Sequence, residues 1–179
     1  MKQLQQSLFI LLISACIIMA VDNHYGHKQY TEASQEDLVV AGHYPDGRKI
    51  YLSHPAADAY ANMNNAAQKD GIAFILISGF RTIQYQKRLF NRAVKKYGSE
   101  EEAARHVAPP GCSEHHTGRA VDIGDKKYPK SALEVSFEKT PAFKWLQNNA
   151  ERFGFVMSFP DTKNSPVSYE PWHWCYHDK

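Results

Sequence analysis

Short apolar runs and amphipathic stretches alternate along the chain and are separated by glycine and proline turn signals. Two apolar runs within residues 38–52 flank Tyr44-Pro45-Asp46-Gly47, which indicates a hairpin or an entry loop. The Ala-rich residues 56–69 carry one apolar stripe and are followed by Gly71, so they predict a helix (Ala59, Met63 and Ala66 or Ala67). The continuous apolar run 72–77 predicts a buried strand.

The middle of the chain predicts two helices. Residues 83–97 form the first, with Gly98 after it and an inward stripe of Ile83, Phe90, Val94 and Tyr97. Ser99 and Glu102 have the spacing of a capping box, which predicts a short helix as far as about Val107. Pro109-Pro110-Gly111 then stops that helix.

The last third predicts one more helix and three strands. Thr140-Pro141 starts a helix that runs to Phe153, with an inner stripe of Phe143, Leu146, Ala150 and Phe153. Strand-like segments are expected at 120–123, 155–157 and 169–176. Residues 125–139 are charged and without clear period, so we expect a surface loop there.

The N-terminus has the pattern of an export signal. Lys2 precedes an apolar run, residues 8–21, that is shorter than the about 20 residues of a membrane span. Three endings are open: lipidation at Cys16 of Ile13-Ser14-Ala15-Cys16, cleavage after Ala20, or retention as a marginal anchor. Each ending exports the body to the cell envelope or the medium, and contact with the membrane is expected only through this segment.

Length and charge narrow the picture further. The 179 residues suffice for one domain with a core, which we expect over residues 38–179, after a signal segment at 1–20 and a flexible tether at 21–37. The net charge of +2 and the absence of a basic run interleaved with aromatics argue against a nucleic-acid partner.

Residues 113–122 concentrate the candidate chemistry. His115 and Asp122 can supply two of the three protein ligands of a catalytic zinc ion, and His116 is an alternative to His115 that spacing does not separate. Gly118 permits the bend that brings the histidine back, and Asp122 shares a strand face with Ala120.

The rest of such a site has to come from distant segments. His173 is the candidate third ligand, and Glu170 is the candidate general base that takes a proton from zinc-bound water. Pro171 interrupts the strand between them and permits a kink that turns both side chains to the metal. Arg81 follows an apolar strand and would balance an oxyanion. These residues have alternative interpretations: His173 as a packed core histidine, Asp122 as a structural aspartate and Arg81 as a surface arginine.

The motif Ser113-x-His115-x-x-Gly118-x-Ala120-x-Asp122, with Glu170-x-Trp172-His173 downstream, resembles the VanY-type D-alanyl-D-alanine carboxypeptidases. These zinc peptidases are related to VanX-type dipeptidases and share the fold of the hedgehog signalling domain. Ser78-Gly79-Phe80-Arg81 with Gln86, and the segment 145–155, match further blocks of the family. The resemblance implies an α+β single domain with a central antiparallel sheet flanked by helices, hedgehog/DD-peptidase-like.

The same resemblance assigns roles to residues. It makes His115, rather than His116, the zinc ligand together with Asp122 and His173, with one Zn²⁺ per chain. Glu170 becomes the base, Arg81 the carbonyl stabiliser, and Gln86 and Ser113 contacts to the terminal residue of the substrate.

The implied reaction removes the terminal D-alanine from peptidoglycan stem peptides, and we expect a monomer to carry it out. An L,D-carboxypeptidase acting on tetrapeptide stems and an endopeptidase are close variants. A non-catalytic zinc-containing module that binds the cell wall is an alternative of another class, but such a module would need neither Glu170 nor Arg81.

Two cysteines remain outside the signal segment, Cys112 and Cys175, and each lies within three residues of a proposed ligand. If those ligands meet at one metal ion, the cysteines lie near each other, and a disulfide between them is expected in an oxidising compartment. Two free thiols, or thiolates that compete for zinc, are the alternatives.

Overall fold

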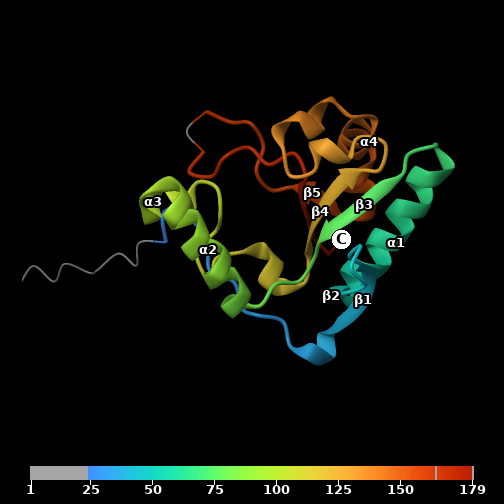
Figure 1. Cartoon of the computed structure of the whole chain (residues 1–179). Coiled ribbons are helices and arrows are strands. Elements are labelled where there is room, and N and C mark those ends of the chain that lie inside the picture. Colours follow the sequence, from blue (N-terminus) through green and yellow to red (C-terminus); the bar gives the residue numbers. More distant parts are fainter. Residues whose placement is uncertain (1–23, 164, 179) are drawn as a thin grey trace, which may run out of the picture.

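The hairpin expected near the start of the domain is present. The computed structural model describes residues 24–163 and 165–178, and in it β1 (Leu38–His43) pairs antiparallel with β2 (Lys49–Ser53). The predicted turn residues 44–47 connect them, and Figure 1 shows the pair beside α1.

The main sheet has four antiparallel strands in the order β3-β4-β6-β5. They are β3 (Phe74–Ser78), β4 (Ala120–Asp125), β5 (Phe155–Met157) and β6 (His173–Tyr176). Strand β4 lies between two neighbours and all six of its residues are buried. The side chains that alternate along β4 therefore point either into the core or toward the opposite face of the sheet.

Two helices provide the main hydrophobic core with the sheet: α1 (His54–Lys69) and α4 (Pro141–Asn149). Thr140 caps α4 as predicted, because its hydroxyl accepts a hydrogen bond from the Phe143 amide. The Trp145 indole donates to Asp70 at 2.7 Å and ties α4 to the end of α1. The buried core includes Leu52, Met63, Val121, Ile123, Leu146, Phe155 and Trp174.

A second, smaller hydrophobic cluster joins α2 (Ile83–Tyr97) to α3 (Glu100–Ala104). In Figure 1 these two helices lie apart from α1 and α4, on the other side of β3 and β4. The predicted Ser99 cap of α3 is present, but the helix ends at Ala104, before the expected Val107. The predicted stripe is wrong at Ile83, which is 37 % exposed, whereas Gln86 is buried in the same helix.

The prediction of a surface loop at residues 125–139 is wrong in part. Two short 3-10 helices form there (Pro129–Ser131 and Val135–Lys139), and Phe137 is fully buried. Asp125 is also buried, because its carboxylate accepts hydrogen bonds from the Lys127 and Ala142 amides. Charge alone suggested solvent here, but these amides satisfy the carboxylate inside the fold.

Three strand and helix boundaries differ from the prediction. Strand β3 starts at Phe74 rather than residue 72 and is only partly buried, because it lies at the sheet edge. The last strand is confined to β6, because residues 171–172 form a turn. The final helix continues beyond Asn149 as a 3-10 turn, Ala150–Phe153, that ends at Gly154.

Residues 24–37, expected to be a flexible tether, instead lie along the domain. The Tyr30 amide donates to the Gly111 carbonyl and the Ala33 amide to the His116 carbonyl, each at 2.8 Å. The Glu32 carboxylate accepts from the Ile83 amide at the start of α2. The predicted signal, with Cys16, lies outside the described residues; within the described part, no helix is long and apolar enough to span a membrane.

Candidate active site

The pairing of β4 with β6 brings together two of the predicted ligands. Asp122 is directly opposite His173, and Val121 is opposite Trp174. Because Val121 and Trp174 are core residues, Asp122 and His173 project from the other face of the sheet. The His173 Nδ1 atom lies 3.2 Å from Asp122 Oδ1, and both side chains are buried.

His115 reaches the same point from the 3-10 turn Glu114–Thr117. Gly118 ends this turn at φ +69°, and a Cβ there would lie 2.9 Å from the Ser53 amide nitrogen, so the position requires glycine. The His115 Nδ1–H donates to the Gly79 carbonyl at 2.7 Å. Its Nε2 is buried, lies 3.3 Å from Asp122 Oδ1 and accepts no hydrogen bond from the described residues.

The three side chains fit a metal ion. One ligand atom from each of His115, Asp122 and His173 lies within 4.8 Å of the others. Burial, together with the positive charge of Arg81, lowers the pKa of His115 to about 4, so its ring is neutral near pH 7. A neutral imidazole with an unpartnered, buried Nε2 beside a carboxylate is a donor set that zinc prefers.

His116 cannot replace His115 in this arrangement. Its Nδ1–H donates to the Arg81 carbonyl at 2.7 Å, and its Nε2 accepts from the Gly111 amide at 3.2 Å. Both ring nitrogens are therefore used within the fold. His116 instead locks the turn after β3 against the turn that carries His115.

Glu114 also belongs to the site; from the sequence it was either a support for a ligand or an ordinary surface carboxylate, and the structure favours the first. Its Oε2 lies 2.8 Å from His173 Nε2 and accepts from the Ser158 hydroxyl at 2.6 Å, while Tyr30 donates to Oε1 at 3.2 Å. Burial would raise the pKa of Glu114, but the interaction with His173 lowers it to about 2. Burial would likewise lower the pKa of His173, but hydrogen bonds to Asp122 and Glu114 raise it to about 10. The contact with Glu114 directs the Nδ1 atom of His173 toward Asp122.

Glu170 also faces the site. The predicted interruption at Pro171 is a turn in which the His173 amide donates to the Glu170 carbonyl at 3.1 Å. Glu170 Oε2 lies 4.0 Å from His173 Nδ1, and burial raises the pKa of Glu170 to about 7. A carboxyl group with such a pKa is able to exchange a proton near neutral pH.

Arg81 contacts the proposed ligand Asp122. Its guanidinium donates to Asp122 Oδ2 and, through Nε, to the Ser78 hydroxyl at 3.0 Å. Burial would raise the pKa of Asp122, but His115 and Arg81 hold it well below the usual value. Arg81 therefore keeps Asp122 ionised, and it also lines a cleft that opens over the site.

A cleft of about 600 Å³ opens over the site between α2 and the main sheet. Gln86 and Ser113, the predicted substrate contacts, both line it and are almost fully buried. The Gln86 Nε2 donates to the Ala108 carbonyl at 2.8 Å, which leaves its buried Oε1 without a partner among the described residues. The cleft also holds Glu114, Glu170 and the three candidate ligands, so the structure gathers the predicted site residues at one opening.

Residues 49–179 match the family described as VanY: D-alanyl-D-alanine carboxypeptidase. This chain belongs to the VanY family. YodJ of Bacillus subtilis is 39 % identical over 131 residues, which cover 72 % of this chain and 47 % of that protein. The chain spans less than half the length of the first three curated relatives that it matches.

Solved structures agree with the VanY assignment. The LD-carboxypeptidase LdcB is similar with a TM-score of 0.71 and 38 % identity, over 81 % of this chain and 69 % of that one. The D,D-pentapeptidase VanY from a VanB-type resistance cassette, solved in complex with Zn(II), has a TM-score of 0.64 and 28 % identity over 84 % of each chain. These likenesses confirm the predicted α+β, hedgehog/DD-peptidase-like fold.

The disulfide predicted beside this VanY-type site is absent from the structure, in which Cys112 and Cys175 are both buried thiols. Their proximity was inferred from the meeting of His115 and His173, but neighbouring ligands do not require sulfur atoms at bonding distance. Burial, together with the negative charge of Glu114, raises the pKa of Cys175 to about 12, so this thiol is a weak competitor for a metal ion.

Proposed function

We propose that this domain is a zinc-dependent carboxypeptidase that removes the C-terminal D-alanine from peptidoglycan stem peptides. The observation that carries the proposal is the buried, unpartnered Nε2 of His115 beside Asp122 and His173, with Glu170 at the same opening. The family match supports the same reaction, and the zinc complex of the related VanY structure supports zinc as the metal; we propose one Zn²⁺ per chain.

His115 Nε2, His173 Nδ1 and an Asp122 oxygen would hold the zinc ion, and His173 would release its Nδ1 proton when the ion binds. When bound, the ion acts as a Lewis acid and lowers the pKa of water at the site. Glu170 would take the proton of the attacking water and deliver it to the departing amine of D-alanine, a role that its raised pKa suits. Arg81 would contribute positive charge near the oxyanion that develops on the scissile carbonyl.

The cleft would bind the end of the peptide. Gln86 retains one amide proton beyond its bond to Ala108 and an unpartnered Oε1, so it can both donate to and accept from the terminal residue. Ser113 supplies a hydroxyl that lines the same cleft. We propose that these two residues position the terminal D-alanine.

A second candidate is L,D-carboxypeptidase activity on tetrapeptide stems. The observation in its favour is the similarity to the LD-carboxypeptidase LdcB, at 38 % identity and a TM-score of 0.71. A module that only binds the wall is less consistent with the site, because Glu170 is partly buried beside the ligands at a cost in desolvation that pure binding does not require.

The cellular setting is also part of the proposal. We place the domain outside the cytoplasm, held at the membrane only by its N-terminal segment or released from it, and acting as a monomer. Mass analysis of the mature N-terminus after expression, with Cys16→Ser as comparison, would show whether lipidation occurs. An unprocessed, cytoplasmic product would contradict the proposed location.

The test of the reaction uses the purified full chain with a synthetic stem pentapeptide and the matching tetrapeptide. We expect the zinc-loaded protein to release one D-alanine from the pentapeptide, to lose this activity after chelation and to regain it with added zinc. Release from the tetrapeptide alone would establish the second candidate. Cleavage that survives complete metal removal, or no cleavage of either peptide, would overturn the proposed mechanism.

A further inference from the structure

Acidic and basic side chains line different parts of the cleft along α2. Its acidic lining residues, Glu114, Asp122 and Glu170, all lie at the candidate metal site. Its far wall instead carries Arg92 and Lys96, two cations from the second half of α2. Neither cation has an ion-pair partner within residues 24–163 and 165–178.

Arg92 and Lys96 are both exposed residues that line the cleft. Lys96 Nζ lies over the Tyr97 ring at 4.8 Å from its centroid, and Tyr97 stacks on His106, whose ring also lines the cleft. The C-terminal dipole of α2 favours a cation at Lys95 as much as at Lys96, yet Lys95 does not line the cleft. The dipole acts within the last turn, so it does not account for Arg92.

The spacing indicates what these cations would meet. A helix rises about 1.5 Å per residue, so Arg92 lies roughly 9 Å and Lys96 roughly 15 Å along α2 from Gln86. An extended peptide advances about 3.3–3.6 Å per residue, so these distances correspond to roughly three to four residues. A carboxypeptidase needs room for only one residue beyond the scissile bond, so the remaining cleft is available to the residues before it.

We propose that Arg92 and Lys96 bind a carboxylate on the stem peptide, upstream of the scissile bond, and so select stems whose γ-linked D-glutamate carries a free α-carboxylate. This inference rests on the proposed function for the identity of the substrate. Exposed arginine and lysine side chains without an ion-pair partner among the described residues suit an anion, and an amidated glutamate offers them no charge.

The test measures binding to the zinc-loaded full chain by calorimetry. The ligands are two pentapeptides that differ only in the D-glutamate α-carboxylate or α-carboxamide, each with its last peptide bond replaced by an uncleavable reduced isostere. We expect the carboxylate ligand to bind about tenfold more tightly, and this preference to decrease with added salt. In Arg92→Gln/Lys96→Gln we expect the two ligands to bind equally.

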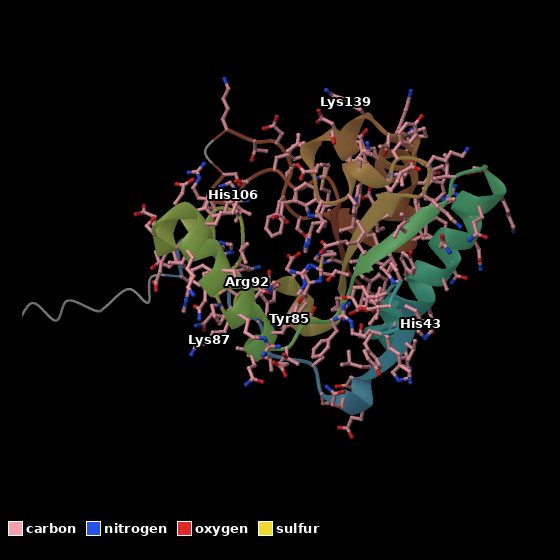
Figure 2. All side chains as sticks on the ribbon, in the orientation of Figure 1. His43, Tyr85, Lys87, Arg92, His106 and Lys139 are labelled. Atoms are coloured by element: carbon pink, nitrogen blue, oxygen red, sulfur yellow. The ribbon has the colours of Figure 1, made fainter. Side chains whose placement is uncertain are left out.

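Lys87→Gln/Lys95→Gln is the matched control, because both lysines are exposed on α2 and neither lines the cleft. Figure 2 shows Lys87 on the outer side of α2 and Tyr85 on the side toward the sheet. The control should keep the tenfold preference. No preference in the unmodified protein, or a preference that survives in Arg92→Gln/Lys96→Gln, would overturn the inference.

Failure of the proposed function is measured separately. Hydrolysis of acyl-L-Lys-D-Ala-D-Ala, which lacks the glutamate, tests the reaction alone. If this peptide is not cleaved, the carboxypeptidase proposal fails. The ratio of affinities for the carboxylate and carboxamide ligands still decides whether Arg92 and Lys96 bind a carboxylate.

Discussion

Glu114 and His173, which are 59 residues apart in the chain, are joined by a 2.8 Å hydrogen bond between Oε2 and Nε2. Glu114 stands next to His115, and His173 pairs across the sheet with Asp122. One carboxylate therefore links the turn that carries the first candidate ligand to the strand that carries the third.

We expect Glu114→Gln to weaken zinc binding by about 10–100-fold, because the neutral amide holds His173 less firmly and makes Nδ1 less basic. Competition with a fluorescent chelator would measure the affinity. Glu151→Gln, a change at an exposed carboxylate, is the control and should leave the affinity unaltered. Equal affinities for both variants would show that Glu114 does not support the metal site.

Zinc should stabilise the folded domain, because the three candidate ligands converge only after β4, β6 and the 114–117 turn are assembled. At a free zinc concentration of 100 times Kd the gain is about 2.7 kcal/mol. For a domain of this size that corresponds to roughly 5–10 °C in Tm by scanning calorimetry. Magnesium should have no such effect, and His115→Ala should abolish the shift. A zinc-induced shift of the same size in His115→Ala would contradict the assigned ligand set.

Glu170→Ala and Glu170→Gln should lower kcat by about 10²–10⁴ while zinc remains bound, because each removes the proton acceptor and neither removes a candidate ligand. Stopped assays of D-alanine release together with metal analysis of the same sample would measure both quantities. Glu134→Ala changes an exposed carboxylate and should keep normal turnover. Near-normal turnover in both Glu170 variants would exclude the base assignment.

Arg81→Ala should lower kcat/KM by about 10²–10³, because the oxyanion loses a nearby positive charge and Asp122 loses an ion-pair partner. Arg81→Lys keeps the charge and should recover part of the loss. Zinc affinity, measured beside the kinetics, separates the two causes: a fall in zinc binding alone would reduce Arg81 to a support for Asp122. Arg88→Ala, on the exposed face of α2, is the control.

Removal of residues 1–37 should destabilise the domain relative to removal of residues 1–23. The longer deletion loses the Tyr30 and Ala33 backbone hydrogen bonds and the Glu32 contact to the start of α2. Each hydrogen bond contributes on the order of 1 kcal/mol, so the difference in unfolding free energy should be about 2–4 kcal/mol. Urea denaturation of the two proteins would measure it. Coincident unfolding curves would mean that residues 24–37 add nothing to stability.

Sequence patterns predicted the structure correctly where interactions between neighbouring residues determine it. The bounds of α2 were predicted correctly, because residues 83–97 combine one apolar stripe with a glycine that ends the helix at φ +89°. The same reasoning failed at Ile83, whose exposure depends on which surfaces α2 meets. It also failed at Asp125, where amides from the next turn and from α4 satisfy a carboxylate that composition had placed in solvent.

The sequence by itself determined the candidate ligands and the base, since ligand chemistry restricts the residue types and the motif places His115, Asp122, Glu170 and His173 at recognisable spacings. Only the tertiary structure decided how these residues meet, because strand pairing sets Asp122 against His173 and a partly buried hydrogen bond brings in Glu114. The tertiary structure also decided two further features: the unpartnered Nε2 of His115 and the cationic wall of α2. Burial and unsatisfied polar atoms arise from contacts between distant segments, which periodicity along the chain does not encode.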